Sequence, residues 1–209
     1  MVAGRQGDSQ VRIDGIDEDT AAIGGPITLY RLSVGAPDQP SSGDFCQADA
    51  RGRRAGFAMP DGAGGFALTC TSGAEGKCVL MGYRPWQPME GVPMRDLHRA
   101  CVHMLRADYG GDDRPTTRNG THVDIYDRFA IQTPDRVEGM QFEAAWGPDG
   151  AICVAHPRIV DNVTLEELGE RYPRLTNRLG PNVCSEAAMR DDPRALLFNG
   201  SMVTARAPN

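Results

Sequence analysis

The sequence lacks the features that mark several large classes of protein. No apolar run in its 209 residues approaches the roughly 20 that cross a bilayer, and residues 1–25 lack the apolar core of a signal peptide. Arginine outnumbers lysine, but the formal net charge is −6 and no basic stripe is present. We therefore expect neither a membrane span nor a nucleic-acid partner.

Glycine and proline are abundant, with Gly 25 and Pro 15, whereas the apolar fraction of 40% is ordinary for a globular protein. Short elements joined by many turns are therefore expected, and the length suits one domain with a substantial core. Residues 1–25 are rich in Gly and Asp and are predicted to form a flexible N-terminal arm, with room for one edge strand at residues 11–13. Residues 26–209 are predicted to form the single domain.

No two of the six cysteines have the Cys-x-x-Cys spacing of a zinc knuckle or redox motif. Their wide separations suit either disulfides or scattered buried thiols. The disulfide candidates are Cys70, Cys78, Cys101, Cys153 and Cys184. The first pairing we expect is Cys70 with Cys78, because residues 64–71 and 77–83 are predicted to form an antiparallel hairpin. The alternative is that both are small buried residues.

Hydrophobic periodicity predicts one principal helix over residues 94–109, with Leu97, Cys101 and Met104 on its buried face and a stop at the glycines that follow. A capping box predicts a short helix over residues 164–171. Strands are predicted at residues 27–34, 64–71, 77–83, 122–127, 139–146 and 151–155. The expected fold is α+β: a mainly antiparallel, twisted sheet packed against the principal helix, plus short helices.

Asp108 lies in the last turn of the predicted helix, where the carbonyl ends disfavour a carboxylate. With Asp112 and Asp113 it could bind a hard cation such as Ca²⁺, or these carboxylates could hold the loop at residues 114–121 through backbone N–H bonds, which is the favoured interpretation. A third interpretation is acid–base catalysis by Asp108 and Asp112 together with His122 and Asp124, which lie on the polar face of their predicted strand.

No nucleophile, metal triad or oxyanion loop accompanies these residues, so no reaction is specified. His98 lies one turn from Cys101, but that sulfur is on the apolar face of the helix and is expected to be buried or bridged. Tyr83, Trp86 and Trp146 could stack on a ligand, although a tryptophan more often belongs to the core. No metal site and no cofactor are predicted.

Several blocks of the sequence occur in a distinctive order: Cys70-Thr-Ser-Gly, Gly82-Tyr-Arg-Pro-Trp86, His98-Arg-Ala-Cys101, Arg106-Ala-Asp-Tyr109 and Ala145-Trp-Gly-Pro-Asp-Gly150. Over roughly residues 64–200 the chain resembles the bacterial ADYC domain family. The resemblance implies a secreted or lipoprotein-type protein, frequently cysteine-rich, with no established activity. Gly110 stands where the family motif ends in cysteine, so a family bridge at that position would be missing here.

The sequence and the resemblance together predict an extracytoplasmic, disulfide-braced domain with a non-catalytic binding or assembly role, whose partner would be a protein or a glycan. One alternative is a small acid–base or hydrolytic enzyme that uses Asp108, Asp112, His122 and Asp124. Another is a calcium-stabilised binding module. A cytoplasmic location is the alternative to an extracytoplasmic one, because residues 1–25 contain no signal peptide. The sequence does not indicate an oligomeric state.

Overall fold

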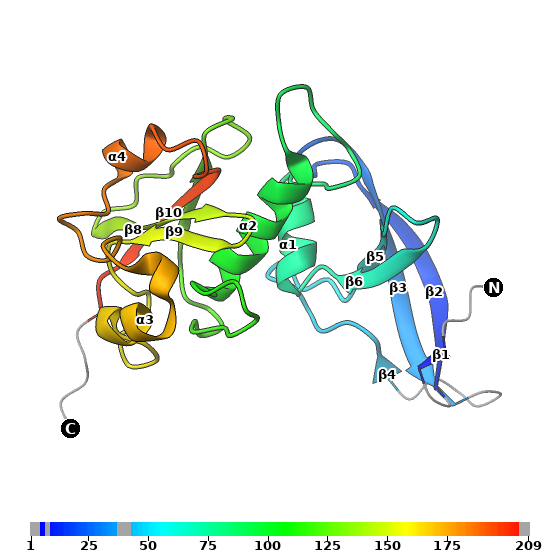
Figure 1. Ribbon diagram of the computed structural model, residues 1–209. Coiled ribbons are helices and arrows are strands. Elements are labelled where there is room, and N and C mark those ends of the chain that lie inside the picture. The colour runs from blue at the N-terminus through cyan, green and yellow to red at the C-terminus, as the bar shows by residue number, and fades with distance from the viewer. Residues whose placement is uncertain (1–4, 7–8, 37–42, 205–209) are drawn as a thin grey trace. The chain divides into compact units, whose positions relative to one another are not determined.

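The computed structural model describes residues 5–6, 9–36 and 43–204 (Figure 1). These residues form two antiparallel sheets and several short helices, so the predicted α+β class is confirmed, although the strands form two sheets and not one. The chain divides into two compact units, residues 1–87 and 88–209, each containing one sheet. Of the helices in the described residues, none combines the length and the hydrophobicity that crossing a bilayer requires.

The sheet of the N-terminal unit is built on the long antiparallel pair of β2 and β3. Its strands are β1 (Arg5–Gln6), β2 (Ser9–Asp19), β3 (Ile27–Gly35), β5 (Gly56–Pro60) and β6 (Phe66–Cys70), in that order, with β4 (Gly43–Asp44) also beside β3. The core of the unit includes Leu29 from β3, Phe57 from β5 and Val79 from the helix α1 (Ala74–Leu80). The strand predicted at residues 27–34 is thus present as β3, and the segment predicted as an arm contains β2.

The predicted hairpin of residues 64–71 and 77–83 is wrong in its second strand, because residues 74–80 form α1. Gly76 permits this arrangement, since a Cβ added there would collide with the carbonyl oxygen of Cys70 at the end of β6. The helix can therefore turn directly back from the strand. β6 pairs instead with β5, which the sequence analysis did not predict.

In the C-terminal unit, a four-stranded sheet packs against the principal helix. The elements are α2 (Met94–Arg106), β7 (Asp124–Asp127), β8 (Met140–Gly147), β9 (Gly150–Val154), α3 (Leu165–Arg171), the 3₁₀ helix η1 (Pro173–Leu175), α4 (Glu186–Arg190) and β10 (Leu197–Met202). The strand order is β7-β10-β8-β9, and α2 contacts β8, β9 and β10. The predicted β8–β9 hairpin is confirmed, as is the capping box of Thr164 and Glu167 that opens α3.

The principal helix ends three residues earlier than predicted. Ala107 adopts the left-handed conformation with φ of 47°, and the N–H of Asp108 donates to the carbonyl of His103 at 2.9 Å. This is the bond pattern that closes a helix with a Schellman motif. Asp108 was predicted to lie in the last turn of the helix, but it lies just beyond the helix end.

Two members of the polar face predicted for residues 122–127, Asp124 and Tyr126, point inward, whereas His122 is exposed. Asp124 and Tyr126 are 6% and 4% exposed, whereas Ile125 between them is half-buried. The predicted alternation is present at Asp124, Ile125 and Tyr126, and here the polar side chains are the buried ones. Buried polar side chains require hydrogen-bond partners, and those partners define the surroundings of Asp124.

All six cysteines are disulfide-bonded. Cys46 joins Cys70 in the N-terminal unit, and Cys153 joins Cys184 in the C-terminal unit. The expected pairing of Cys70 with Cys78 is wrong, because the hairpin on which it depended does not form. Cys46, which was not among the predicted candidates, takes the place of Cys78 as the partner.

Candidate functional site

The loop that follows α2 is organised by one buried carboxylate. Asp108 is 0% exposed; its Oδ1 accepts the N–H of Gly111 at 3.0 Å and of Asp112 at 3.2 Å. Its Oδ2 accepts the N–H of Asp113 at 3.0 Å and lies 3.0 Å from Nδ1 of His103. Burial alone would raise the pKa of Asp108, but these hydrogen bonds outweigh burial and lower the pKa below its usual value.

Asp108 therefore holds a loop through backbone N–H groups, as predicted, but the loop that it holds is residues 111–113 and not residues 114–121. The predicted target, residues 114–121, is held by Thr116, whose N–H donates to the carbonyl of Arg106 at 3.1 Å. The hydroxyl of Thr116 also donates to the carbonyl of Ala107 at 2.7 Å. Both carbonyls belong to the end of α2, where intrahelical partners are lacking.

The residue after Asp108 enters a buried polar network. The phenol of Tyr109 donates to Oε1 of Glu143 at 2.9 Å and accepts the N–H of Arg158 at 2.8 Å. The guanidinium of Arg158 donates to both oxygens of Glu143, at 3.0 and 3.1 Å, and to the carbonyls of Met104 and Leu105. Glu143 and Arg158 are 0% and 1% exposed. The arginine thus meets both a carboxylate and the carbonyl end of α2, where a cation is favoured.

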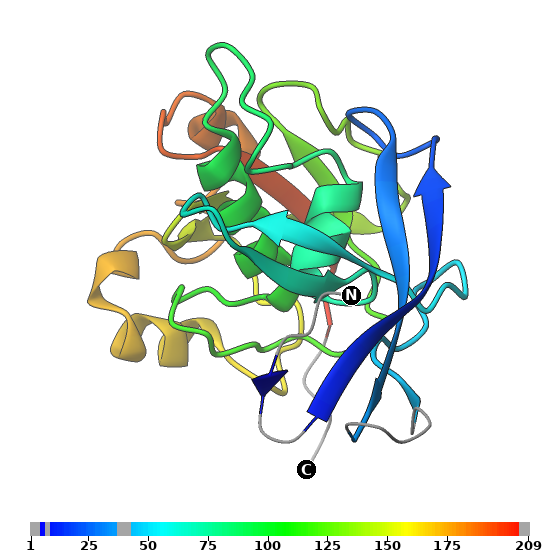
Figure 2. The same ribbon diagram turned by 90° about the vertical axis from the view of Figure 1, so that its right-hand side faces the viewer.

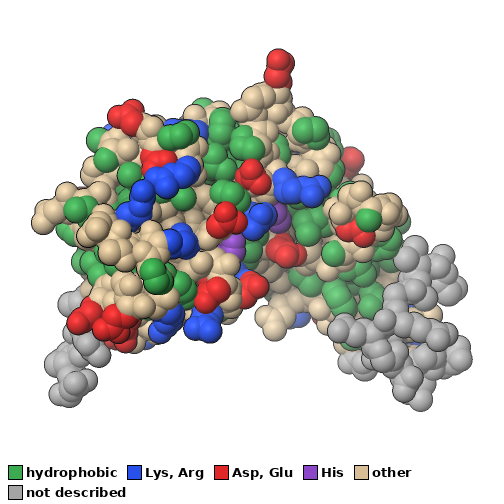
Figure 3. Space-filling model, viewed as in Figure 1, with side chains coloured by type: hydrophobic (Ala, Val, Ile, Leu, Met, Phe, Trp, Pro, Cys, Tyr) green, Lys and Arg blue, Asp and Glu red, His purple; other side chains and the backbone are tan. Residues whose placement is uncertain are grey.

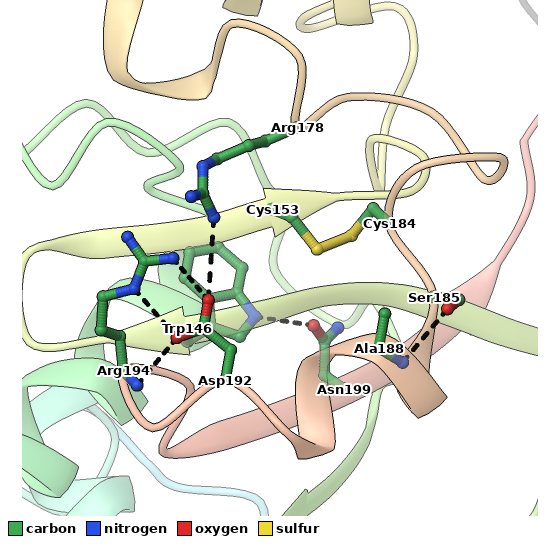
Figure 4. The surroundings of a disulfide bond; sticks show 9 residues. All are labelled: Trp146, Cys153, Arg178, Cys184, Ser185, Ala188, Asp192, Arg194 and Asn199. Carbon is green, nitrogen blue, oxygen red and sulfur yellow. Dashed lines mark hydrogen bonds and ion pairs between the residues drawn. A yellow bond between two sulfur atoms is a disulfide. The ribbon is translucent and has the colours of Figure 1, made fainter.

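The ring of Tyr109 stacks on Trp146, with centroids 5.3 Å apart. Trp146 is fully buried, and its Nε1 donates to Oδ1 of Asn199 at 2.8 Å (Figure 4). Of the other two residues predicted to stack on a ligand, Tyr83 is fully buried and Trp86 is half-buried against the core of the N-terminal unit. Two of the three rings are therefore enclosed by protein.

Two more aspartates of the C-terminal unit hold loops as Asp108 does. Asp124 accepts the N–H groups of Asp135 at 2.9 Å and Arg136 at 3.2 Å. Asp127 accepts three backbone N–H groups from residues 129–132. Each side chain replaces a missing backbone partner with a carboxylate oxygen, which fixes an irregular segment without a regular element.

The structure brings together only part of the predicted acid–base set. Asp112 donates its backbone N–H to Asp108, and its exposed carboxylate accepts the hydroxyl of Tyr172 at 3.1 Å. His122 is exposed just before β7, and Asp124 is buried within that strand. In the described part of the chain, no hydrogen bond or ion pair joins Asp108 or Asp112 to His122 or Asp124.

A pocket of about 390 Å³ lies beside Asp124 and Tyr126 and is also lined by Glu186 and Gln141. Burial raises the pKa of Tyr126 well above its usual value, with Glu186 adding to the effect, so the phenol stays protonated. Across the described ranges, no cluster of three or more His, Cys, Asp or Glu residues could hold a metal ion. The pocket can accept hydrogen-bond donors, and none of its side chains is an activated nucleophile.

The disulfide between Cys153 and Cys184 joins β9 to the segment that precedes α4 (Figure 4). Ser185, the next residue, caps α4 with its hydroxyl. Beyond that helix, Asp192 receives the guanidinium of Arg194, which lowers the pKa of Asp192 to about 2. The C-terminal segment is therefore fixed at several points before β10 begins.

The family model of the ADYC domain matches residues 1–160, which is more than half of the chain. The chain belongs to the ADYC domain family. The match begins and ends earlier than the range of 64–200 assigned from the sequence blocks, so it includes the N-terminal sheet of this ADYC protein. No curated protein and no solved structure matches the chain.

The residues of the ADYC motif in this chain have distinct structural roles. Ala107 closes α2, Asp108 holds the following loop, and Tyr109 joins the buried network. At the fourth position, a Cβ added to Gly110 would collide with the ring of Tyr172. The ring of Tyr172 thus occupies the space that a cysteine side chain at position 110 would need. Because all six cysteines are disulfide-bonded, the lack of a cysteine at position 110 leaves no unpaired thiol.

Proposed function

We propose that this ADYC domain protein is an extracytoplasmic, non-catalytic component that binds a partner or contributes to an assembly. The observation that supports this most is the use made of its buried carboxylates. Asp108 and Asp124, the buried members of the predicted acid–base set, accept backbone N–H groups with both oxygens. A carboxylate engaged in this way can act as a general base only at the expense of the loop that it holds.

The extracytoplasmic location is supported by the thiol chemistry. All six cysteines are disulfide-bonded, and disulfides persist mainly in oxidising compartments. A simple measurement tests this point: denatured, non-reduced protein purified from its native compartment is treated with an alkylating reagent. We expect no alkylated cysteine, and six reactive thiols would contradict the proposed location.

A protein or glycan partner agrees better with the surface than nucleic acid does. Figure 3 shows acidic and basic side chains interspersed over the face of the C-terminal unit that it displays. The formal net charge of −6 adds no general attraction for phosphate. Recognition by shape, hydrogen bonds and local charge is therefore the expected mode.

The catalytic alternative is tested with panels of chromogenic carboxylic esters, phosphate esters, glycosides and peptides. We expect no turnover above buffer for the wild type. Turnover that is lost in His122→Ala and retained in the control His156→Ala, with the melting temperatures of both variants unchanged, would overturn the proposal. His122 is the informative residue, because it is exposed and its replacement leaves the core intact.

A further inference from the structure

The N-terminal unit leaves the outer edge of its longest strand open. β1 pairs with β2 only at Ser9 and Gln10, whereas β3 pairs with β2 along its length. Over residues 13–19, β2 therefore has a described strand on one side only, and Figure 2 shows it as the outermost long strand of its sheet. An open edge presents backbone N–H and C=O groups that another extended chain can pair with.

The side chains along this edge combine exposed apolar groups with charge of one sign. Ile13 is 46% exposed and Ile16 is 65% exposed. Residues 13–19 also carry four acidic side chains and no basic one: Asp14, Asp17, Glu18 and Asp19. Asp17 is ion-paired with Arg31, and Asp19 with Arg51 and Arg53, so within the described residues Asp14 and Glu18 are the two without an ion pair. Charges and a bulge at Asp14 would by themselves protect an edge against aggregation. Protection does not explain why two large apolar side chains remain exposed on the same strand, and a binding edge does.

A pocket of about 600 Å³ adjoins the strand and suits a long basic side chain. Leu29 and Leu32 of β3 contribute apolar walls, and Asp14, Asp17 and Asp44 are among the acidic residues that line it. Arg31, Arg53 and Arg54 also line the pocket and are ion-paired with Asp17, Asp19 and Asp44, so among the residues that the structure describes the uncompensated negative charge comes from Asp14 and Glu18. An apolar wall with carboxylates around it matches a lysine or arginine, whose aliphatic stem packs while the charged end remains near solvent.

We propose that the edge of β2 over residues 13–19 binds an extended, basic segment of a partner protein as an added strand. The inference rests on the proposed binding role and specifies the chemistry of the partner. Backbone hydrogen bonds supply the affinity, and alternate basic side chains face the carboxylates. A second copy of this chain does not fit, because pairing β2 with itself would set acidic residues against acidic residues.

The test measures binding of a fluorescent, end-blocked heptapeptide of alternating lysine and valine to the full chain by anisotropy. We expect it to bind at least about tenfold more tightly than its glutamate–valine counterpart. Two further versions are N-methylated at the odd or at the even positions. One of them is expected to lose about tenfold in affinity, because only one set of N–H groups faces β2.

The variant Asp14→Lys/Glu18→Lys is expected to bind the lysine peptide about tenfold more weakly. Its matched control, Glu170→Lys/Asp191→Lys, has the same net charge change at exposed positions of the other unit and is expected to change affinity less than about twofold. Circular dichroism checks that both variants are folded, and Glu18→Gln replaces the double variant if the latter does not fold.

Equal weakening in the two lysine variants would show general charge attraction and overturn the inference. Unchanged binding of both N-methylated peptides, or no binding of any peptide, would overturn it as well. These outcomes leave the proposed non-catalytic role standing, because that role is judged by turnover. Conversely, turnover in the substrate panels would overturn the proposed role without altering the peptide result.

Discussion

Each unit contains a fully buried arginine, and the two are compensated in different ways. In the C-terminal unit, Arg158 forms a two-point ion pair with Glu143. In the N-terminal unit, Arg84 donates to the carbonyls of Ile23, Gly25 and Pro26 and to the side chain of Gln87. Within the described residues, no carboxylate is hydrogen-bonded to Arg84, and its Nε has no hydrogen-bond partner. The buried arginine of the C-terminal unit is thus compensated by a carboxylate, and that of the N-terminal unit by backbone carbonyls of a loop.

The two arginines differ in whether water could solvate their hydrogen-bond partners after a substitution. Burial lowers the pKa of Arg84, and Asp19 only partly offsets this effect. The carbonyls that accept hydrogen bonds from Arg84 belong to residues 23–26, which are exposed. Water can therefore replace the guanidinium as the donor to these carbonyls. Water has no such access to Glu143 and Arg158. Removing a hydrogen-bond partner from the buried network should therefore be more destabilising in the C-terminal unit than in the N-terminal unit.

The largest effect is expected from breaking the buried pair. Glu143→Leu leaves Arg158 without its carboxylate, which should lower the free energy of unfolding by roughly 3–5 kcal/mol. The double variant Glu143→Leu/Arg158→Met should lose less than this single variant, because neither charge remains buried. Urea unfolding measures both. A double variant that is less stable than Glu143→Leu would show that the pair contributes more than mutual compensation.

The disulfides of the two units should be similar in their contribution to stability but different in their rate of reduction. Cys153–Cys184 and Cys46–Cys70 have sequence separations of 31 and 24 residues. Replacing either pair by alanine should therefore cost a similar amount, about 3 kcal/mol. Reduction should differ, because Cys70 is half-buried whereas Cys153 and Cys184 are each 1% exposed. Timed alkylation in mild reductant, followed by mass spectrometry, should find Cys46–Cys70 opening first, and simultaneous opening of both would contradict this.

Arg84→Met should cost less than Glu143→Leu, about 1–2 kcal/mol of unfolding free energy, because the abandoned carbonyls can be solvated. The control is Arg95→Met at an exposed position of α2, for which we expect less than about 0.5 kcal/mol. Thermal and urea unfolding measure both variants. A loss at Arg84 equal to that of Glu143→Leu would mean that water does not reach residues 23–26, and the contrast between the units would disappear.

Local patterns were enough to predict β3, α2, the capped helix α3 and the β8–β9 hairpin, because periodicity, caps and turn residues act over a few positions. Residues 74–80 are too short for period to distinguish a strand from a helix, and the deciding contact is between Gly76 and the end of β6. The partner of Cys70 was likewise set by a tertiary contact, since β5 separates it from Cys46 in the chain.

At the candidate site, the sequence pointed to Asp108 but missed the residues behind it. Glu143 and Arg158 lie on different segments, and no spacing rule joins them to Tyr109. One signal was present: Glu143 is the charged residue within the otherwise apolar stretch Phe142-Glu-Ala-Ala-Trp146 of a predicted strand. A charge at such a position requires a buried counter-charge, but the sequence does not say which arginine supplies it.

The smallest effect is expected at Asp108, and its pH dependence separates charge from shape. Because the folded-state pKa of Asp108 is lowered, its carboxylate stabilises the fold above the unfolded value of about 3.9. That contribution is lost as the pH falls through the lower folded value. Asp108→Asn should therefore lose about 1 kcal/mol of unfolding free energy at neutral pH.

The stability gap between the wild type and Asp108→Asn should narrow as the pH falls below about 3.9 and through the lower folded-state pKa of Asp108, because the wild-type carboxylate then loses its charge as well. Asp112→Asn is the control: its side chain is exposed, and it should show a gap below about 0.5 kcal/mol across the same pH range. A constant gap at Asp108 would mean that the loop responds to the shape of the side chain and not to its charge. The C-terminal unit would then resemble the N-terminal unit, where Arg84 holds a loop through backbone carbonyls and, among the described residues, forms no ion pair.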